Sequence, residues 1–274
     1  MSYLFLFILG LAVGSFLNVL IDRLPNEESI GGRSRCDECL TKLAWNDLIP
    51  VLSYVKLRGK CRYCKMNLSW QYLFIELFTG LVFVVVGSMS PLSLEPAYAS
   101  GNISINQSLL SLHTSFLRMA AYLGIVSTAI VIFFSDLKYH IIPDSMLILL
   151  FAFSFLLVVS FGLTPQLFLD HVIGAFVVIT PILFLFLITK GRGMGFGDVK
   201  LAFSMGFLLG PLGGLTALYI AFVGGAVVGI CLLIAGKRGW KSKIAFGPFL
   251  IIGLITMLWW GERILEIVKG LYGV

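Results

Sequence analysis

Long apolar runs recur along this chain and are separated by short polar stretches. A helix needs about 20 mainly apolar residues to cross a bilayer. Runs close to that length occupy roughly residues 2–21, 71–89, 116–135, 145–162, 171–189, 212–235 and 244–261. Because 58% of the residues are hydrophobic and only 12% are charged, the chain carries more apolar surface than one water-soluble core of this length could bury. We therefore predict an all-α polytopic membrane protein.

The first run, "MSYLFLFILGLAVGSFLNVLID", has neither the positively charged start nor the small-residue cleavage site of a signal peptide. It is also longer than the hydrophobic region of an ordinary signal peptide. We expect this segment to be retained, with residues 1–21 forming the first transmembrane helix.

Positively charged residues indicate the orientation of the spans, since loops rich in Lys and Arg stay in the cytoplasm. The 22–70 segment carries Arg23, Arg33, Arg35, Lys42, Lys56, Arg58, Lys60, Arg62 and Lys65, whereas residues 88–115 carry no Lys or Arg. The later basic residues alternate correctly only if a shorter run, residues 201–210, counts as a crossing, although it could also be re-entrant. This predicts about eight transmembrane helices with both termini outside, a cytoplasmic loop at 22–70 and a helical core at 71–274.

The net charge of +6 is accounted for by these cytoplasmic loops. No basic stripe with interleaved aromatic residues lies outside them, so we predict the lipid bilayer as a partner and no nucleic acid.

Two aspartates are predicted to meet at the cytoplasmic ends of their spans. Asp136 ends the third span in "FFSDLKYHIIPD", and Asp198 begins the sixth in "GMGFGDVK". Two spans lie between them, so the chain returns to the same face and the two carboxyl groups lie at one depth. Carboxyl groups held together in a low-dielectric site tend to share one proton, so that one serves as a base toward water and the other as an acid. This arrangement is that of an aspartyl protease, and the glycines before Asp198 would let a substrate backbone approach closely.

Other interpretations of the polar residues stay open. Asp198 could instead cap the helix that follows it, and capping is the role that we predict for Asp144. A proton- or cation-coupled transporter would also place paired aspartates in its spans, but the ionisable residues here gather at one face. Asp170 and His171 are expected to be solvated at the outer interface, and Cys231 to be a small buried side chain.

Four cysteines form two Cys-x2-Cys pairs in the 22–70 loop, at Cys36, Cys39, Cys61 and Cys64. Two such pairs offer four thiolates to a tetrahedral zinc ion, and a cytoplasmic loop favours thiolates over disulfides. Two disulfides and an iron–sulfur centre remain as alternatives. The zinc would be structural, because four protein ligands leave no open position for chemistry. A non-enzymatic zinc-bearing scaffold is accordingly another possible function.

Taken together, these residues resemble a known family, the bacterial prepilin peptidases, which are GxGD aspartyl proteases. The resemblance covers nearly the whole chain. It rests on "GSFLNVLIDRLP" (14–25), "SRCDEC" (34–39), "IPVLSYVKLRGKCRYC" (49–64), "YLFIE" (72–76), "DLKYHIIPD" (136–144), "GFGDVK" (195–200) and "FGPFL" (246–250).

The resemblance implies a location and a reaction. The enzyme would sit in the bacterial inner membrane with its active site facing the cytoplasm, and would cut the leader from type IV prepilins and the pseudopilins of type II secretion after a glycine. It would then N-methylate the new first residue with S-adenosylmethionine. The resemblance predicts no oligomeric state.

By the family's motifs, the catalytic residues fall on Asp136 and Asp198 and the zinc ligands on the four loop cysteines. Leu40 and Lys65 stand where the family usually has a glycine after each second cysteine. For methylation, the resemblance points only to Glu76 and the 14–25 stretch as nearby candidates.

Overall fold

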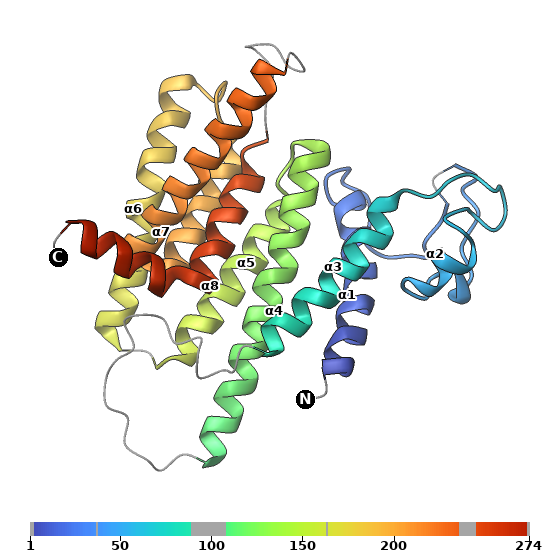
Figure 1. Ribbon diagram of the computed structural model, residues 1–274, viewed down its shortest axis with the longest axis horizontal. Helices are drawn as coiled ribbons and strands as arrows, with labels where there is room; N and C mark the ends of the chain where they lie inside the picture. The colour runs from blue at the N-terminus through green and yellow to red at the C-terminus, as the bar shows by residue number, and fades with distance from the viewer. Residues whose placement is uncertain (1–2, 37, 89–107, 163, 236–244, 273–274) are drawn as a thin grey trace. The chain divides into compact units, whose positions relative to one another are not determined.

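The computed structural model describes residues 3–36, 38–88, 108–162, 164–235 and 245–272. Within these ranges the regular elements are helices, and strand-like pairing is confined to two isolated bridges, Arg35 with Lys42 and Lys60 with Asn67. The elements are α1 (Tyr3–Arg23), η1 (Trp45–Asp47), α2 (Leu52–Lys56), α3 (Trp70–Ser88), α4 (Ser108–Tyr139), α5 (Asp144–Ser160), α6 (Pro165–Thr189), α7 (Phe196–Ile234) and α8 (Gly247–Tyr272) (Figure 1). The all-α prediction is therefore confirmed.

Five of the described helices are long and apolar enough to cross a membrane: Tyr3–Arg23, Trp70–Ser88, Ser115–Tyr139, Pro165–Thr189 and Phe196–Ile234. Asp144–Ser160 is apolar but shorter. The protein is thus multi-pass, as predicted, while the count of eight crossings stays a prediction. Two segments that the orientation argument used, 89–107 and 236–244, lie outside the described residues.

The chain divides into two compact units, Met1–Ser90 and Pro91–Val274. In the first unit, α1 packs directly on α3. A Cβ added to Gly10 would lie 2.7 Å from the Cα of Gly80, and one added to Gly14 would lie 2.8 Å from the Cα of Glu76. Small residues one helical turn apart therefore let the two backbones touch, as is common between membrane helices.

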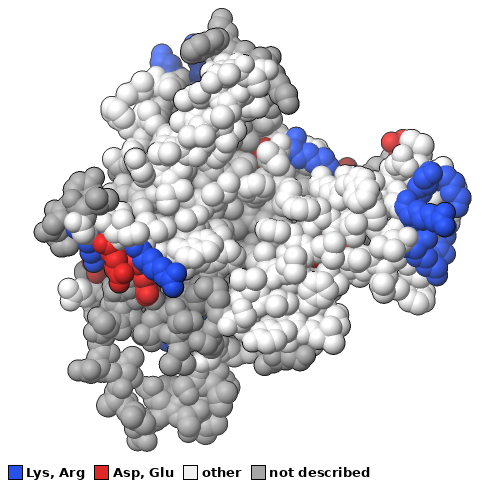
Figure 2. Space-filling model, in the orientation of Figure 1, with Lys and Arg blue, Asp and Glu red and all other residues white. Residues whose placement is uncertain are grey.

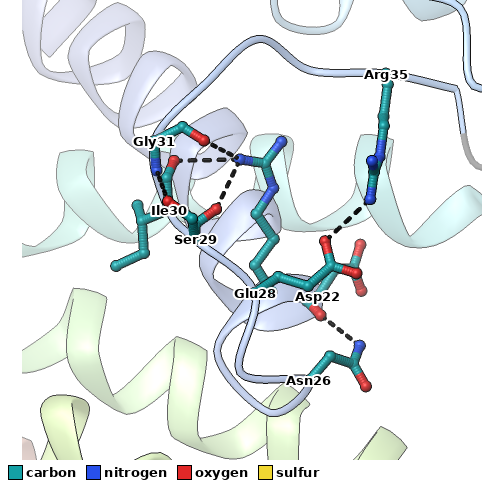
Figure 3. Close-up of polar contacts among 8 residues, drawn as sticks. Asp22, Asn26, Glu28, Ser29, Ile30, Gly31 and Arg35 are labelled. Carbon is teal, nitrogen blue, oxygen red and sulfur yellow. Dashed lines mark hydrogen bonds and ion pairs between the residues drawn. The ribbon is translucent and has the colours of Figure 1, made fainter.

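The loop that follows α1 is tied back to the end of that helix (Figure 3). One guanidinium nitrogen of Arg23 donates to the carbonyl groups of Ser29, Ile30 and Gly31, each at 3.2 Å. Asn26 donates to the backbone carbonyl of Asp22 at 2.7 Å, so a carbonyl that the helix end leaves free is satisfied. Further along, Glu28 and Arg35 form an exposed ion pair at 3.3 Å. The loop beyond is strongly basic, and Figure 2 shows its Lys and Arg side chains gathered together, whereas most of the visible helix surface is uncharged.

The second unit holds α4 to α8, in which α7 packs on α5, α6 and α8, and α4 packs on α5 and α8 (Figure 1). Within the range of α7, Gly210 has a non-helical backbone (φ 70°, ψ −177°) and precedes Pro211, so two helices meet here. In a straight helix, residues 206 and 214 would lie about 12 Å apart. A Cβ added to Gly214 would instead lie 3.2 Å from the Cα of Gly206. The chain therefore reverses at Gly210, and α7 is a hairpin of two helical arms.

This reversal is stabilised by a histidine of the neighbouring helix. Pro211 has no N–H, so it cannot bond with the carbonyl of Phe207 four residues earlier. His171 of α6 lies with its Nδ1 2.6 Å from that carbonyl oxygen. Since a carbonyl only accepts, Nδ1 carries the proton and donates it. The side chain is 2% exposed, so the prediction that His171 is solvated is wrong.

Candidate active site and metal centre

Asp136 is the fourth residue from the end of α4, and its side chain is 6% exposed. The backbone N–H of Gly247, the first residue of α8, donates to Asp136 Oδ2 at 2.9 Å. A Cβ at Gly247 would lie 2.7 Å from the same oxygen. Only a glycine therefore lets the α8 backbone approach this carboxylate so closely. The stretch "FGPFL" carried the family resemblance, but nothing in it indicated that its glycine contacts Asp136.

Asp198 lies in the first turn of α7, and its side chain is 7% exposed. Its Oδ2 accepts from the backbone N–H of Gly195 at 3.1 Å, so the helix-cap interpretation describes one of its two oxygens. The other oxygen, Oδ1, is buried and has no hydrogen-bond partner among the described residues. A cap alone does not explain why a second carboxylate oxygen is buried with nothing bonded to it.

The structure brings these two aspartates together. The carboxylates of Asp136 and Asp198 interact electrostatically with each other. Ile142, in the turn after α4, packs against the residues that neighbour both aspartates. Cβ atoms added to Gly197, next to Asp198, and to Gly247, which binds Asp136, would lie 3.1 and 3.2 Å from its side chain. Two carboxyl groups that interact in a buried site cannot both be ionised without a large cost.

Asp144 does not cap α5, which corrects that prediction. Pro143 occupies the capping position, and Asp144 is the first helical residue. Its two carboxylate oxygens instead accept from the ammonium group of Lys200 at 2.7 and 2.8 Å. Both side chains are exposed, at 68% for Asp144 and 39% for Lys200. The ion pair thus joins the starts of α5 and α7 at the surface of the second unit.

The four loop cysteines converge, and their sulfur atoms all lie within 4.8 Å of one another. All four are free thiols, so the alternative of two disulfides is not present. Four thiolates at about 2.3 Å from a tetrahedral zinc ion lie about 3.8 Å apart, and the Sγ atoms of Cys36 and Cys64 are separated by 3.8 Å. The donor set therefore fits a metal ion such as zinc.

The two cysteine pairs share one local conformation. In the first, the N–H of Leu40 donates to the carbonyl of Cys36 at 2.9 Å, and in the second, the N–H of Lys65 donates to the carbonyl of Cys61 at 3.1 Å. Leu40 and Lys65 have φ values of 55° and 61°. These are the positions where the resembling family has glycine, and the left-handed backbone gives the physical reason for that preference.

Hydrogen bonds from the side chain and backbone of Thr41 lower the pKa of the Cys39 thiol to about 6. The thiolate is the form that binds a metal ion, so this shift favours metal binding at Cys39. The fifth cysteine, Cys231 in α7, is exposed on the chain rather than buried as predicted. In a membrane helix, such an exposed position can face lipid.

A second group of polar side chains lies between α1 and α3. The Glu76 carboxylate, on a residue 8% exposed, accepts from the N–H of Val51 at 2.7 Å. Asn18 is 3% exposed and donates through Nδ2 to the carbonyl of Tyr72 at 3.1 Å. The hydroxyl of Tyr72 in turn donates to Asp22 at 3.1 Å. The resemblance pointed to this region, but Asn18 was not singled out by the sequence.

Comparison with known proteins shows which family the chain resembles. Residues 8–89 match the Bacterial Peptidase A24 N-terminal domain, and residues 123–230 match the Type IV leader peptidase family. No solved structure matches the chain.

Several curated relatives carry the name "Prepilin leader peptidase/N-methyltransferase". The one from Burkholderia pseudomallei (strain 1026b) is 31% identical over 95% of this chain and 86% of its own length. The one from Stutzerimonas stutzeri is 32% identical over 94% of this chain and 90% of its own length. The one from Myxococcus xanthus (strain DK1622) is 33% identical over 87% of this chain and 66% of its own length. The chain therefore belongs to the prepilin leader peptidase/N-methyltransferase family of A24 peptidases.

Proposed function

We propose that the chain is a membrane aspartyl endopeptidase that removes the leader from type IV prepilins and pseudopilins. Cleavage would follow a glycine and take place at the cytoplasmic face of the bacterial inner membrane. The enzyme would then methylate the new N-terminal residue with S-adenosylmethionine. The observation that carries the proteolytic part is the adjacent, buried pair Asp136 and Asp198 in a chain whose relatives are named for prepilin processing. Those relatives give no support to the transporter alternative.

The hydrogen bonds of the two aspartates suit this chemistry. One oxygen of each carboxyl group is held by a backbone N–H, from Gly247 for Asp136 and from Gly195 for Asp198. These bonds fix the orientation of both groups, while Asp198 Oδ1 is left without a protein partner among the described residues. In the proposed reaction, the ionised member of the pair takes a proton from water as that water attacks the scissile carbonyl. The protonated member donates to the carbonyl oxygen.

The cysteine cluster is proposed to hold one structural zinc ion through Cys36, Cys39, Cys61 and Cys64. The sulfur distances support this assignment. With four thiolate ligands, the ion would fix the loop and take no part in peptide cleavage.

The test uses purified protein in detergent micelles, a synthetic prepilin peptide and mass spectrometry. Asp136→Asn and Asp198→Asn should each abolish cleavage, because asparagine can neither share the proton nor act as a base. Asparagine still offers an oxygen to the glycine N–H, so both variants should fold. The double variant should be no worse than either single one, since residues acting as a unit fail together.

Asp144→Asn is the matched control, because this aspartate also lies near the same helix ends but is exposed and paired only with Lys200. It should retain most of the cleavage rate. Substantial cleavage by folded Asp198→Asn would show that Asp198 is only a helix cap, and the protease proposal would then be wrong.

A further inference from the structure

The polar residues between α1 and α3 are unexpected at a place where two apolar helices touch through glycine. An ionisable side chain buried between membrane helices is costly and is usually retained for a function. Peptide cleavage, as proposed above, makes no use of Glu76 or Asn18, which belong to the first unit, whereas the aspartate pair belongs to the second. Peptide cleavage therefore does not explain why these polar side chains are buried here.

The first observation is that Glu76 is held firmly but is not neutralised by a positive charge. Its carboxylate accepts from the N–H of Val51 at 2.7 Å and from the hydroxyl of Ser15. Both partners are neutral donors. No described Lys or Arg forms an ion pair with this carboxylate.

The second, independent observation is an unused acceptor beside Glu76. Asn18 Nδ2 is bonded to the carbonyl of Tyr72, but Asn18 Oδ1 is buried and has no hydrogen-bond partner among the described residues. Leaving such an acceptor unpaired costs about 1–3 kcal/mol. Along α1, Asn18 lies one turn beyond Ser15, which binds Glu76, and along α3, Tyr72 lies one turn before Glu76. Asn18 and Glu76 thus lie on neighbouring turns of two helices that pack directly on each other.

We propose that Glu76 and Asn18, here called the acceptor pair, bind the α-ammonium group of the newly exposed N-terminal residue for methylation. This inference rests on the proposed methyltransferase function and names its amine-binding site. The ligand must be a hydrogen-bond donor, because both groups present oxygen acceptors, and a cation suits the Glu76 carboxylate, because no described Lys or Arg is paired with it. An ammonium group has three N–H donors and suits such a pair. The sulfonium of the methyl donor has no N–H or O–H at its charge, so it would leave Asn18 Oδ1 unpaired. The methyl donor's own α-ammonium has the same chemistry as the peptide amine, and a comparison of free-amine with N-acetylated peptide distinguishes the two.

The geometry assigns a proton-transfer role to Glu76. An ammonium group cannot attack a methyl donor until it loses a proton, and the Glu76 carboxylate takes that proton. The nitrogen lone pair then forms an N–C bond with the methyl group while the C–S bond of the sulfonium donor breaks. The sulfur keeps the electron pair and leaves as a thioether, and the product is a secondary methylammonium. Glu76 finally releases its proton to water, which restores the carboxylate.

The experiment separates the two reactions on the same full-length protein in micelles. A pre-cleaved peptide that begins with phenylalanine is incubated with S-adenosylmethionine, and methylation is followed by mass. An uncut prepilin peptide is assayed in parallel. Glu76→Gln retains an oxygen for the Val51 N–H but cannot take a proton. It should slow methylation at least a hundredfold and leave leader cleavage within about threefold. Asn18→Leu should raise the KM for the pre-cleaved peptide about tenfold.

Thr79→Val is the matched control. Thr79 is a fully buried polar residue on the same helix, but its hydroxyl is already bonded to the carbonyl of Ile75 at 2.7 Å. Its loss should leave methylation nearly unchanged. Wild-type methylation rates in both Glu76→Gln and Asn18→Leu would overturn the assignment of the acceptor pair.

A peptide-binding measurement distinguishes failure of the proposed methyltransferase function from failure of the proposed amine site. If the wild-type protein cuts prepilin but does not methylate, the methyltransferase part of the proposed function fails. The acceptor pair is still tested by peptide binding, because the wild type should bind the free-amine peptide about tenfold more tightly than its N-acetylated form, and Glu76→Gln should lose that preference. Equal binding of both peptides to the wild type would refute the amine site.

Discussion

Leu40 and Lys65 offer a quantitative test of the cysteine cluster. Both residues follow the second cysteine of a pair, and both have the left-handed backbone conformation, with φ values of 55° and 61°. That conformation costs a residue with a Cβ roughly 1–2 kcal/mol. Glycine avoids this cost but gives up about 0.5–1 kcal/mol through its greater freedom in the unordered chain. Each glycine replacement should therefore stabilise the ordered loop by about 0.5–1 kcal/mol.

The structure indicates that little else is lost on replacement. The Leu40 side chain is 64% exposed, and the hydrogen bonds of both residues to Cys36 and Cys61 are made by the backbone. If metal binding orders the loop, the gain appears as affinity. For Leu40→Gly combined with Lys65→Gly, a gain of about 1–2 kcal/mol corresponds to a five- to thirtyfold tighter zinc complex.

The assay is competition for zinc against a chromophoric chelator, with the full chain in micelles at one pH. The matched control is Leu40→Ala combined with Lys65→Ala, which removes the same side chains, including the positive charge, but keeps a Cβ at each left-handed position. Alanine should give no gain or a slight loss. Equal affinities for the glycine and alanine variants would show that backbone conformation does not limit metal binding, and the reasoning would be wrong.

Three further changes test the second unit. Gly247→Ala should reduce cleavage at least tenfold while the protein stays folded, because the new Cβ would lie 2.7 Å from Asp136 Oδ2 and displace that carboxylate; peptide turnover measures this, and a normal rate would contradict the contact. His171→Phe should lower stability by about 1–3 kcal/mol, because the carbonyl of Phe207 would lose its only side-chain donor that the structure describes; the midpoint of denaturation in micelles measures it, with no change counting against the role of the histidine. Asp144→Asn should change the free energy of unfolding by less than about 1 kcal/mol, since an exposed ion pair contributes little. The same denaturation measurement should show a still smaller change when salt is added, because salt screens the charges.

The sequence predicted the main features of the aspartate site for a physical reason. Counting crossings places Asp136 and Asp198 at the same face whatever the detailed packing, and the structure does bring the two together. The contact of Asp136 with Gly247 could not be predicted in this way, because the two residues are 111 positions apart. Only the packing of α8 against the end of α4 creates that contact.

Two of the wrong predictions, those for His171 and Asp144, have a common cause. His171 was expected to be solvated because it lies near a predicted span end, but the carbonyl that it binds is freed by a proline 40 residues later in the sequence. Asp144 was expected to cap its own helix, since proline followed by aspartate is typical of a helix start. Its carboxylate instead binds Lys200 of another helix. In both cases, a long-range partner replaced the local one that sequence patterns describe.

The reversal at Gly210 has a consequence for how this chain lies in a bilayer. The first arm of α7, residues 196–209, rises only about 21 Å, whereas the hydrocarbon layer is about 30 Å thick. An arm that begins at one boundary of the membrane therefore ends within the hydrocarbon, where no water is available for the backbone groups of a turn. The imidazole of His171 takes the place of that water at the carbonyl of Phe207. Because the chain reverses there, the second arm, residues 211–234, runs back toward the face from which the first arm entered. At about 36 Å it is long enough to reach that boundary, so α7 enters and leaves the membrane on one face.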